Sequence, residues 1–187
     1  MKTVLITCFE PFENRPTNAS TEAVRQLPDR IGQWDIRKLQ LPVVYGQAPQ
    51  KAIVCAKEIG AELILCVGEA GGREDVTVEQ IGINLRAARI ADNAGRQPEN
   101  EPCVTGGADG LFATIPVADA VKTLQKEGLP VRVSYTAGTF ICNDVLYSVL
   151  HTFAGTDIRC GFVHVPAYGD TALSAACLLR LLQYLTD

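Results

Sequence analysis

The order of apolar segments along the chain is the feature that most constrains its fold. Short β-type runs alternate with segments of helical periodicity, first a strand over 3–7, then a helix over 20–27 and a strand over 35–43. A helix over 47–59 leads into 62–67, a continuous apolar strand of the kind that is buried on both faces of a parallel sheet. This βαβ order predicts an α/β fold, a three-layer α/β/α sandwich around a mostly parallel (mixed) twisted sheet.

The alternation continues to the end of the chain. Further elements are expected as a strand over 77–84, a polar loop over 92–102, a helix over 117–128, a strand over 131–135, a helix beginning near 142, a strand over 160–165 and a helix over 171–185. There is no internal repeat and no low-complexity linker. A length of 187 residues suits one compact domain, so we expect a single domain over 1–187.

Composition excludes several classes of protein. The formal net charge of -4 and the absence of a Lys/Arg-rich run argue against a nucleic-acid partner. No window approaches the roughly 18 apolar residues of a membrane-spanning helix, and the first apolar run is too short for a signal peptide. The seven cysteines are odd in number and lack CxxC spacing, so neither a disulfide framework nor a zinc site is expected. We therefore expect a cytoplasmic protein with reduced thiols and no metal.

Three unusual loops follow predicted strands, at 8–12, 68–73 and 137–142. In open α/β sheets, ligands bind outside the carboxyl ends of the strands. If these strands are parallel, one edge of the sheet gathers all three loops, and the functional site is expected there.

A cysteine stands at a position suited to chemistry. Cys142 follows a small, flexible turn and begins the amphipathic run 141–150. In the first turn of a helix, the dipole favours thiolate over thiol, and unpaired N–H groups can bind an oxyanion. We predict a reactive thiol here. The alternative is a buried, unreactive cysteine, which is the commoner role of free Cys.

A cysteine nucleophile needs a base, and the chain has only two histidines. His151 lies nine residues along the same predicted helix, about 13 Å from Cys142 and on the opposite face, so it is excluded. His164 ends a strand just before Pro166 and is the better candidate. The alternative for His164 is a half-buried structural histidine bound to a backbone carbonyl.

A base also needs a group that fixes its orientation. Strand alternation places Glu79 on the same face as Ile81 and Ile83, and a carboxylate on an apolar face requires a partner. Glu79 could therefore orient His164, or it could be an edge glutamate in water. Arg89, just beyond this strand, could pair with a carboxylate or stabilise an oxyanion, and spacing does not decide between these roles.

Several motifs together carry a family resemblance that extends over nearly the whole chain. The most specific are Phe-Glu-Pro-Phe at 9–12, Ala-Gly-Gly-Arg at 70–73, Ala-Arg-Ile at 88–90, Thr-Ala-Gly-Thr-Phe-Ile-Cys-Asn at 136–143, and His164. In these motifs the chain resembles pyroglutamyl peptidase I, also called pyrrolidone carboxyl peptidase. That family consists of cytosolic cysteine exopeptidases that remove N-terminal pyroglutamate (5-oxoproline) from peptides.

The resemblance implies a role for each candidate residue. Cys142 is the nucleophile of a thioester acyl-enzyme, His164 the general base and acid, and Glu79 the orienting carboxylate. Arg89 assists at the oxyanion beside the backbone N–H of Cys142. No metal or organic cofactor is implied, and the family's habit of assembly implies a homodimer or homotetramer.

The resemblance also implies a substrate pocket, for peptides with N-terminal pyroglutamate, formed by Phe9, Phe12, Glu69, Phe140 and Ile141. Aromatic faces would cover the ring methylenes of the lactam, and a charged amino terminus would be rejected because its burial is costly. For the three phenylalanines the alternative is ordinary core packing.

The chain departs from the family pattern at several positions. Glu69 replaces a usual glutamine, Asp144 a usual histidine and Cys8 a usual glycine, and the loop after Pro166 is short. An ionised glutamate only accepts hydrogen bonds, whereas glutamine also donates. One alternative is therefore a catalytically weak or inactive family member that binds a small molecule or peptide. A second is a redox sensor that uses Cys142 and Cys8.

Overall fold

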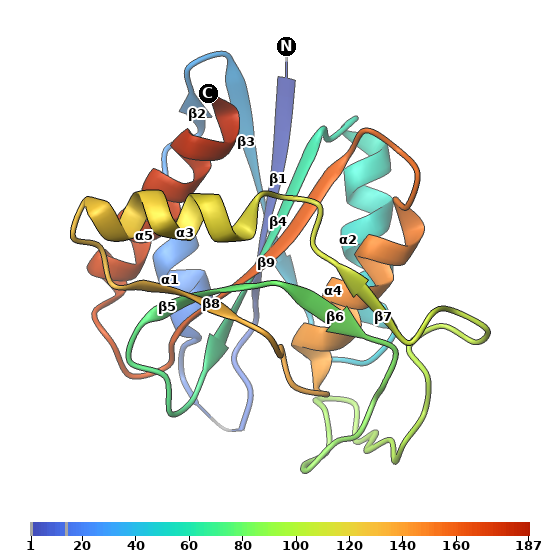
Figure 1. The fold of residues 1–187 in the computed structure, drawn as a ribbon. Coiled ribbons are helices and arrows are strands. Elements are labelled where there is room, and N and C mark those ends of the chain that lie inside the picture. The colour runs from blue at the N-terminus through green and yellow to red at the C-terminus, as the bar shows by residue number, and fades with distance from the viewer. Residues whose placement is uncertain (1, 14) are drawn as a thin grey trace.

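The computed structural model describes residues 2–13 and 15–187, which form a layer of strands between two layers of helices (Figure 1). The strands are β1 (Lys2–Phe9), β2 (Arg30–Ile31), β3 (Trp34–Leu41), β4 (Leu63–Ala70), β5 (Val76–Glu79), β6 (Ile81–Ile83), β7 (Gly110–Phe112), β8 (Val131–Ser134) and β9 (Arg159–Pro166). The helices are α1 (Ala19–Arg25), α2 (Gln47–Glu58), α3 (Val117–Lys126), α4 (Ile141–Thr152) and α5 (Thr171–Thr186).

Seven of these strands form one sheet in the order β2-β3-β1-β4-β9-β5-β8, and β6 and β7 form a separate pair. Within the large sheet, β1 is parallel to β3 and β4, β4 to β9, and β5 to β8. The β2–β3 and β5–β9 pairs are antiparallel. The mostly parallel, mixed sheet expected from the βαβ order is thus confirmed.

The two faces of the sheet carry different hydrophobic cores. Helices α1, α3 and α5 cover one face, and α2 and α4 cover the other (Figure 1). Successive residues of β1 divide between them, with Val4 and Ile6 in the first core and Leu5 and Phe9 in the second. Central strands are therefore buried on both sides, which explains the continuous apolar runs in the sequence.

The strand expected over 77–84 is interrupted, which corrects the sequence interpretation. β5 ends at Glu79, and β6 pairs with β7 in the second sheet. Between them, the Gln80 N–H donates to the Ser134 carbonyl (2.7 Å) and the Gln80 carbonyl accepts from the Ala113 N–H (2.9 Å). Gln80 thus bonds to two different segments, and the alternation that placed Glu79 with Ile81 does not run through it.

Two short strands, β2 and β7, have no counterpart in the expected elements, while 92–102 is irregular as expected. Among the residues that the structure describes, no helix is long and apolar enough to cross a membrane. The same residues contain no group of three or more His, Cys, Asp or Glu side chains arranged to hold a metal. All seven cysteines are unpaired thiols.

Candidate active site

The three loops singled out in the sequence meet at the carboxyl ends of β1 and β4. There they surround a small cavity of about 50 Å³. Its walls are Phe9, Phe12, Asn18, Val43, Glu69, Phe140, Ile141 and Cys142. All five residues expected in a substrate pocket therefore line one cavity, together with the predicted nucleophile.

Aromatic rings shape the cavity. The rings of Phe12 and Phe140 lie 6.3 Å apart between centroids, and the rings of Tyr45 and Phe140 form a T-shaped pair with 5.5 Å between centroids. Phe9 is buried in the core on the α2 and α4 side, whereas Phe12 and Phe140 are only partly buried. An uncharged, flat ligand would find mostly carbon surface here.

Cys142 lies in the first turn of α4, with Phe140 as the N-cap. The first N–H of α4 that bonds back within the helix belongs to Asp144, to the Phe140 carbonyl at 3.2 Å. The N–H of Cys142 precedes this ladder and is available to a ligand. The buried Asn143 fixes this end of α4 by exchanging hydrogen bonds with the Ile83 backbone, at 2.8 and 3.0 Å.

The absence of a side chain at Gly68 makes room for the thiol. A Cβ atom built on Gly68 would lie 2.7 Å from Cys142 Sγ and 3.0 Å from the Phe162 ring. Sγ therefore rests directly on β4. His164 is the register partner of Gly68 in the neighbouring parallel strand β9, so its side chain emerges on the same face of the sheet as the thiol.

The His164 ring is held from two sides. It packs against Phe162 with 4.9 Å between ring centroids, and its Nδ1 lies 2.7 Å from Oε1 of Glu79. Both side chains are buried. Because the carboxylate accepts a hydrogen bond from Nδ1–H, Nε2 is the ring nitrogen left free to exchange a proton with the thiol.

Arg73 is a site residue that the sequence analysis did not assign. Its guanidinium donates to Glu79 Oε1 at 2.7 Å and to the Thr136 carbonyl at 2.9 Å, and it also contacts the Thr77 hydroxyl. It thereby joins the buried carboxylate to the loop that leads into α4. The signal in the sequence was a buried carboxylate in need of a cation, together with the Ala-Gly-Gly-Arg motif.

The other candidate residues lie elsewhere. Arg89 is exposed, and its side chain makes no hydrogen bond or ion pair with any described residue. Arg73, not Arg89, pairs with Glu79. His151 is exposed at the end of α4 and stacks on Tyr147 at 6.1 Å, away from the thiol as expected.

Burial and pairing set the protonation states of the histidine and its partner. Burial alone would raise the pKa of Glu79, but the hydrogen bond from His164 and the charge of Arg73 hold that pKa below its usual value. Burial lowers the pKa of His164, and Glu79 only partly opposes this. At neutral pH the pair is thus a carboxylate and a neutral imidazole.

The thiol is not activated in the way the sequence predicted. Burial raises the pKa of Cys142 above its usual value, the nearby carboxylates Glu79 and Glu69 raise it further, and Arg73 only partly opposes them. Burial and these carboxylates favour the neutral thiol, contrary to the thiolate that the helix position predicted. Chemistry at Cys142 therefore requires a base that takes the thiol proton.

Glu69 departs from the family pattern and is held by two other segments. One carboxylate oxygen forms an ion pair with Arg15, and the other accepts the Ala19 N–H at 2.6 Å. Only 3% of the Glu69 side chain is exposed. Burial raises its pKa, the N–H of Ala19 and the charge of Arg15 oppose the rise, and Glu13 adds to it.

Two other departures from the family pattern, Asp144 and Cys8, are accommodated by their immediate surroundings. Asp144 is fully buried, pairs with Arg86 at 2.7 Å, and accepts the Gly46 N–H at 2.9 Å. Cys8 packs in the core on the side of the sheet that α1, α3 and α5 cover, whereas Cys142 packs on the opposite face. A disulfide between these two cysteines is therefore excluded by the sheet itself, and the redox-sensor hypothesis is wrong.

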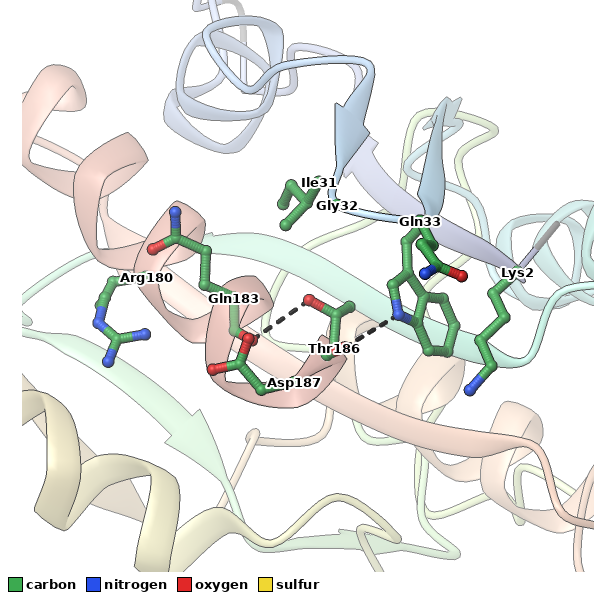
Figure 2. A pocket seen from close by; sticks show the side chains of 9 residues that line it. Lys2, Ile31, Gly32, Gln33, Arg180, Gln183, Thr186 and Asp187 are labelled. Atoms are coloured by element: carbon green, nitrogen blue, oxygen red, sulfur yellow. Dashed lines mark hydrogen bonds between the residues drawn. The ribbon is translucent and has the colours of Figure 1, made fainter.

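A separate hollow of about 570 Å³ lies between the turn joining β2 to β3 and the end of α5 (Figure 2). Lys2, Gln183 and Asp187 project around it, and Trp34 Nε1 donates to the Thr186 carbonyl at 3.0 Å. None of the predicted site residues lines this hollow. Cys142 and the five predicted pocket residues line the smaller cavity instead.

Comparison with known proteins identifies the family of this chain. The profile of the pyroglutamyl peptidase family matches residues 2–176. The pyrrolidone-carboxylate peptidase of Enterococcus faecalis is 44% identical over 187 residues, covering 98% of this chain and 88% of that protein. The corresponding protein of Thermococcus onnurineus is 43% identical over 172 residues, covering 91% and 86%.

Solved structures extend the likeness to three dimensions. Pyroglutamyl peptidase I of Bacillus amyloliquefaciens has a TM-score of 0.93 at 34% identity and covers 99% of this chain and 97% of its own. Pyrrolidone carboxyl peptidase of Thermococcus litoralis has a TM-score of 0.92 at 30% identity, with 100% and 94% covered. From the match over nearly its whole length, this chain belongs to the pyroglutamyl peptidase family.

Proposed function

We propose that the protein is a cysteine exopeptidase that removes N-terminal pyroglutamate from peptides through a thioester acyl-enzyme. Cys142 is the nucleophile, His164 the general base and acid, and Glu79 the residue that orients His164. The observation that carries this proposal is the 2.7 Å contact between His164 Nδ1 and Glu79, beside a thiol that borders an aromatic cavity. Membership of the pyroglutamyl peptidase family supports the same substrate.

The first half of the reaction forms the thioester. As Cys142 Sγ attacks the pyroglutamyl carbonyl carbon, its proton passes to Nε2 of His164, and Glu79 stabilises the imidazolium. The N–H of Cys142 donates to the resulting oxyanion. The C–N bond then breaks, and His164 returns the proton to the nitrogen of the leaving amine.

The second half releases the acid. Water enters after the peptide leaves, gives a proton to His164 and attacks the thioester carbon. The C–S bond breaks, and the proton returns from His164 to the Cys142 sulfur. These reaction steps require a neutral imidazole and a neutral thiol at the start. The raised pKa of Cys142 and the lowered pKa of His164 favour those two states.

The cavity suits the acyl group that the proposal requires. Phe9, Phe12 and Phe140 cover the ring of pyroglutamate, with Ile141 and Glu69 completing the walls. Arg89 is also proposed as a contributor at the oxyanion, a role that rests on the family resemblance alone. A reaction of this type needs no metal or organic cofactor.

Glu69 supports one alternative. Both of its oxygens are already bonded, and its charge raises the pKa of the Cys142 thiol. A catalytically weak or inactive member of the family that acts as a small-molecule or peptide binding protein would have the same cavity. It differs from the enzyme in forming no thioester.

Hydrolysis of a fluorogenic pyroglutamyl amide tests the proposal. The parent protein should release the amine, and Cys142→Ala should reduce release to the uncatalysed background because the nucleophile is gone. Cys55→Ala, a partly exposed thiol on α2, is the matched control and should remain active. Failure of the folded parent to release the amine under reducing conditions contradicts the enzyme and favours the binding protein.

We also propose a setting for this activity. Scattered, unpaired cysteines suit the reducing cytoplasm, residues 1–187 constitute one domain, and the family resemblance favours a homodimer or homotetramer. Sedimentation of the purified protein distinguishes these assemblies from a monomer.

A further inference from the structure

Arg15 connects three segments at the outer side of the cavity. Its guanidinium forms an ion pair with Glu69 at the end of β4 and donates to the Ala167 carbonyl at 3.1 Å, in the loop after β9. It also lies over the exposed ring of Tyr168, 5.0 Å from the centroid. The Arg15 side chain is one quarter exposed, whereas that of Glu69 is almost completely buried.

The pair determines the charge of the cavity wall. Among the described residues that line the cavity, Glu69 is the only charged one, and the others are aromatic, aliphatic, amide or thiol. A buried carboxylate without a counter-charge attracts cations strongly, because little water screens it. With Arg15 in place, the carboxylate is matched by a positive charge and the wall has no net charge.

We propose that Arg15 is a specificity-determining residue, which neutralises Glu69 and so prevents an amino-terminal cation from taking the place of the uncharged lactam. This inference rests on the proposed function, since it concerns what the same cavity admits. Arg15 does not line the cavity and acts through Glu69, so it is a positioning residue in this role.

Proline and pyroglutamate make the sharpest comparison. Their five-membered rings have nearly the same shape, but proline has a protonated secondary amine where pyroglutamate has a neutral amide. An apolar pocket distinguishes rings of equal size poorly, so discrimination rests on the ring carbonyl, which proline lacks, and on charge. Ordinary peptides also begin with a cation, and the same charge balance keeps them out.

The test is isothermal titration calorimetry with two probes, the uncharged pyroglutamamide and the singly charged prolinamide. All protein variants also carry Cys142→Ala, so that no turnover occurs. Arg15→Met should tighten prolinamide binding by about tenfold relative to pyroglutamamide, because Glu69 then lacks its counter-charge. Arg15→Lys keeps the charge and should keep the original selectivity. Arg15→Met with Glu69→Gln should also restore it.

Arg180→Met is the matched control, since Arg180 pairs with Glu127 on the exposed surface at 2.6 Å, and it should alter neither ligand. The proposal is overturned if Arg15→Met weakens the binding of both probes equally, which is the result expected if Arg15 only orders the loop. It is also overturned if the gain in prolinamide binding persists with Glu69→Gln. Turnover of the pyroglutamyl amide by the parent is measured separately, so failure of the proposed function remains distinguishable from either result.

Discussion

Among single residues, Glu79 has the most demanding environment. Its carboxylate is fully buried, yet one oxygen accepts hydrogen bonds from both His164 and Arg73, each at 2.7 Å. A buried charge is tolerated only with such partners. This explains how a glutamate is tolerated in a buried strand, and it makes the protonation of His164 depend on the charge of Glu79.

Replacing Glu79 with Gln should therefore lower the pKa of His164 further, because the carboxylate is what opposes the effect of burial. The neutral imidazole is the active base, so the acid limb of kcat/KM should move to lower pH. Loss of the oriented base should reduce kcat by roughly 10²–10⁴-fold. Steady-state kinetics across pH measure both effects. An acid limb that stays at the same pH contradicts the pairing of Glu79 with His164. Glu127→Gln, in an exposed ion pair, serves as control.

Between elements, the site depends on how closely the first turn of α4 approaches β4. Apolar residues of α4 hold it on the sheet, and Gly68 leaves no side chain in the way of the Cys142 sulfur. The periodicity of α4 was readable in the sequence, whereas this approach was not. The sequence of α4 alone does not indicate which residue of β4 lies opposite the thiol, and the sequence of β4 does not indicate it either.

The Gly68→Ala variant should displace the thiol, because the new Cβ would lie 2.7 Å from Cys142 Sγ. We expect a loss of about 1–3 kcal/mol in the free energy of unfolding, and about 10²-fold lower kcat/KM from the misplaced nucleophile. Urea denaturation and the amide assay measure these. Gly71→Ala is the control, since no described atom outside its own chain neighbours lies within 4 Å of its Cβ position. Equal behaviour of the two variants would rule out the close approach.

For the whole molecule, buried titratable groups link stability to pH. The pKa of folded His164 lies below its unfolded value of 6.5, so its contribution to stability is present above pH 6.5 and is lost as pH falls toward the folded pKa. Glu79 adds a second loss of stability below pH 4.5, because its pKa in the folded protein is also lowered. Glu69 has a raised pKa, and its ionisation opposes folding as pH rises from 4.5.

The free energy of unfolding should therefore decline as the protein is acidified below about pH 6.5, with a slope from His164 of at most about 1.4 kcal/mol per pH unit. His164→Gln should remove this first stage of the decline. His151→Gln, at the exposed end of α4, should leave it intact. Denaturant titrations from pH 7.5 to 5 measure the difference, and parallel declines for the parent and His164→Gln would contradict the linkage.

Local information in the sequence determined the α/β class, the order of the elements and the gathering of three loops at one edge of the sheet. These follow from the periodicity of contiguous residues and from the general geometry of parallel strands. Residue chemistry was sufficient to nominate Cys142, His164 and Glu79. The short strands β2 and β7 escaped prediction because two or three residues carry no clear period.

Tertiary structure alone decided the rest. It selected Arg73 over Arg89 as the partner of Glu79, and it raised the pKa of Cys142 where helix position alone favoured a thiolate. It also set Cys8 and Cys142 on opposite faces of the sheet. Ion pairs and burial depend on strand register and on helix packing between residues far apart in the chain. Periodicity along one segment contains no information about which distant side chain will lie opposite.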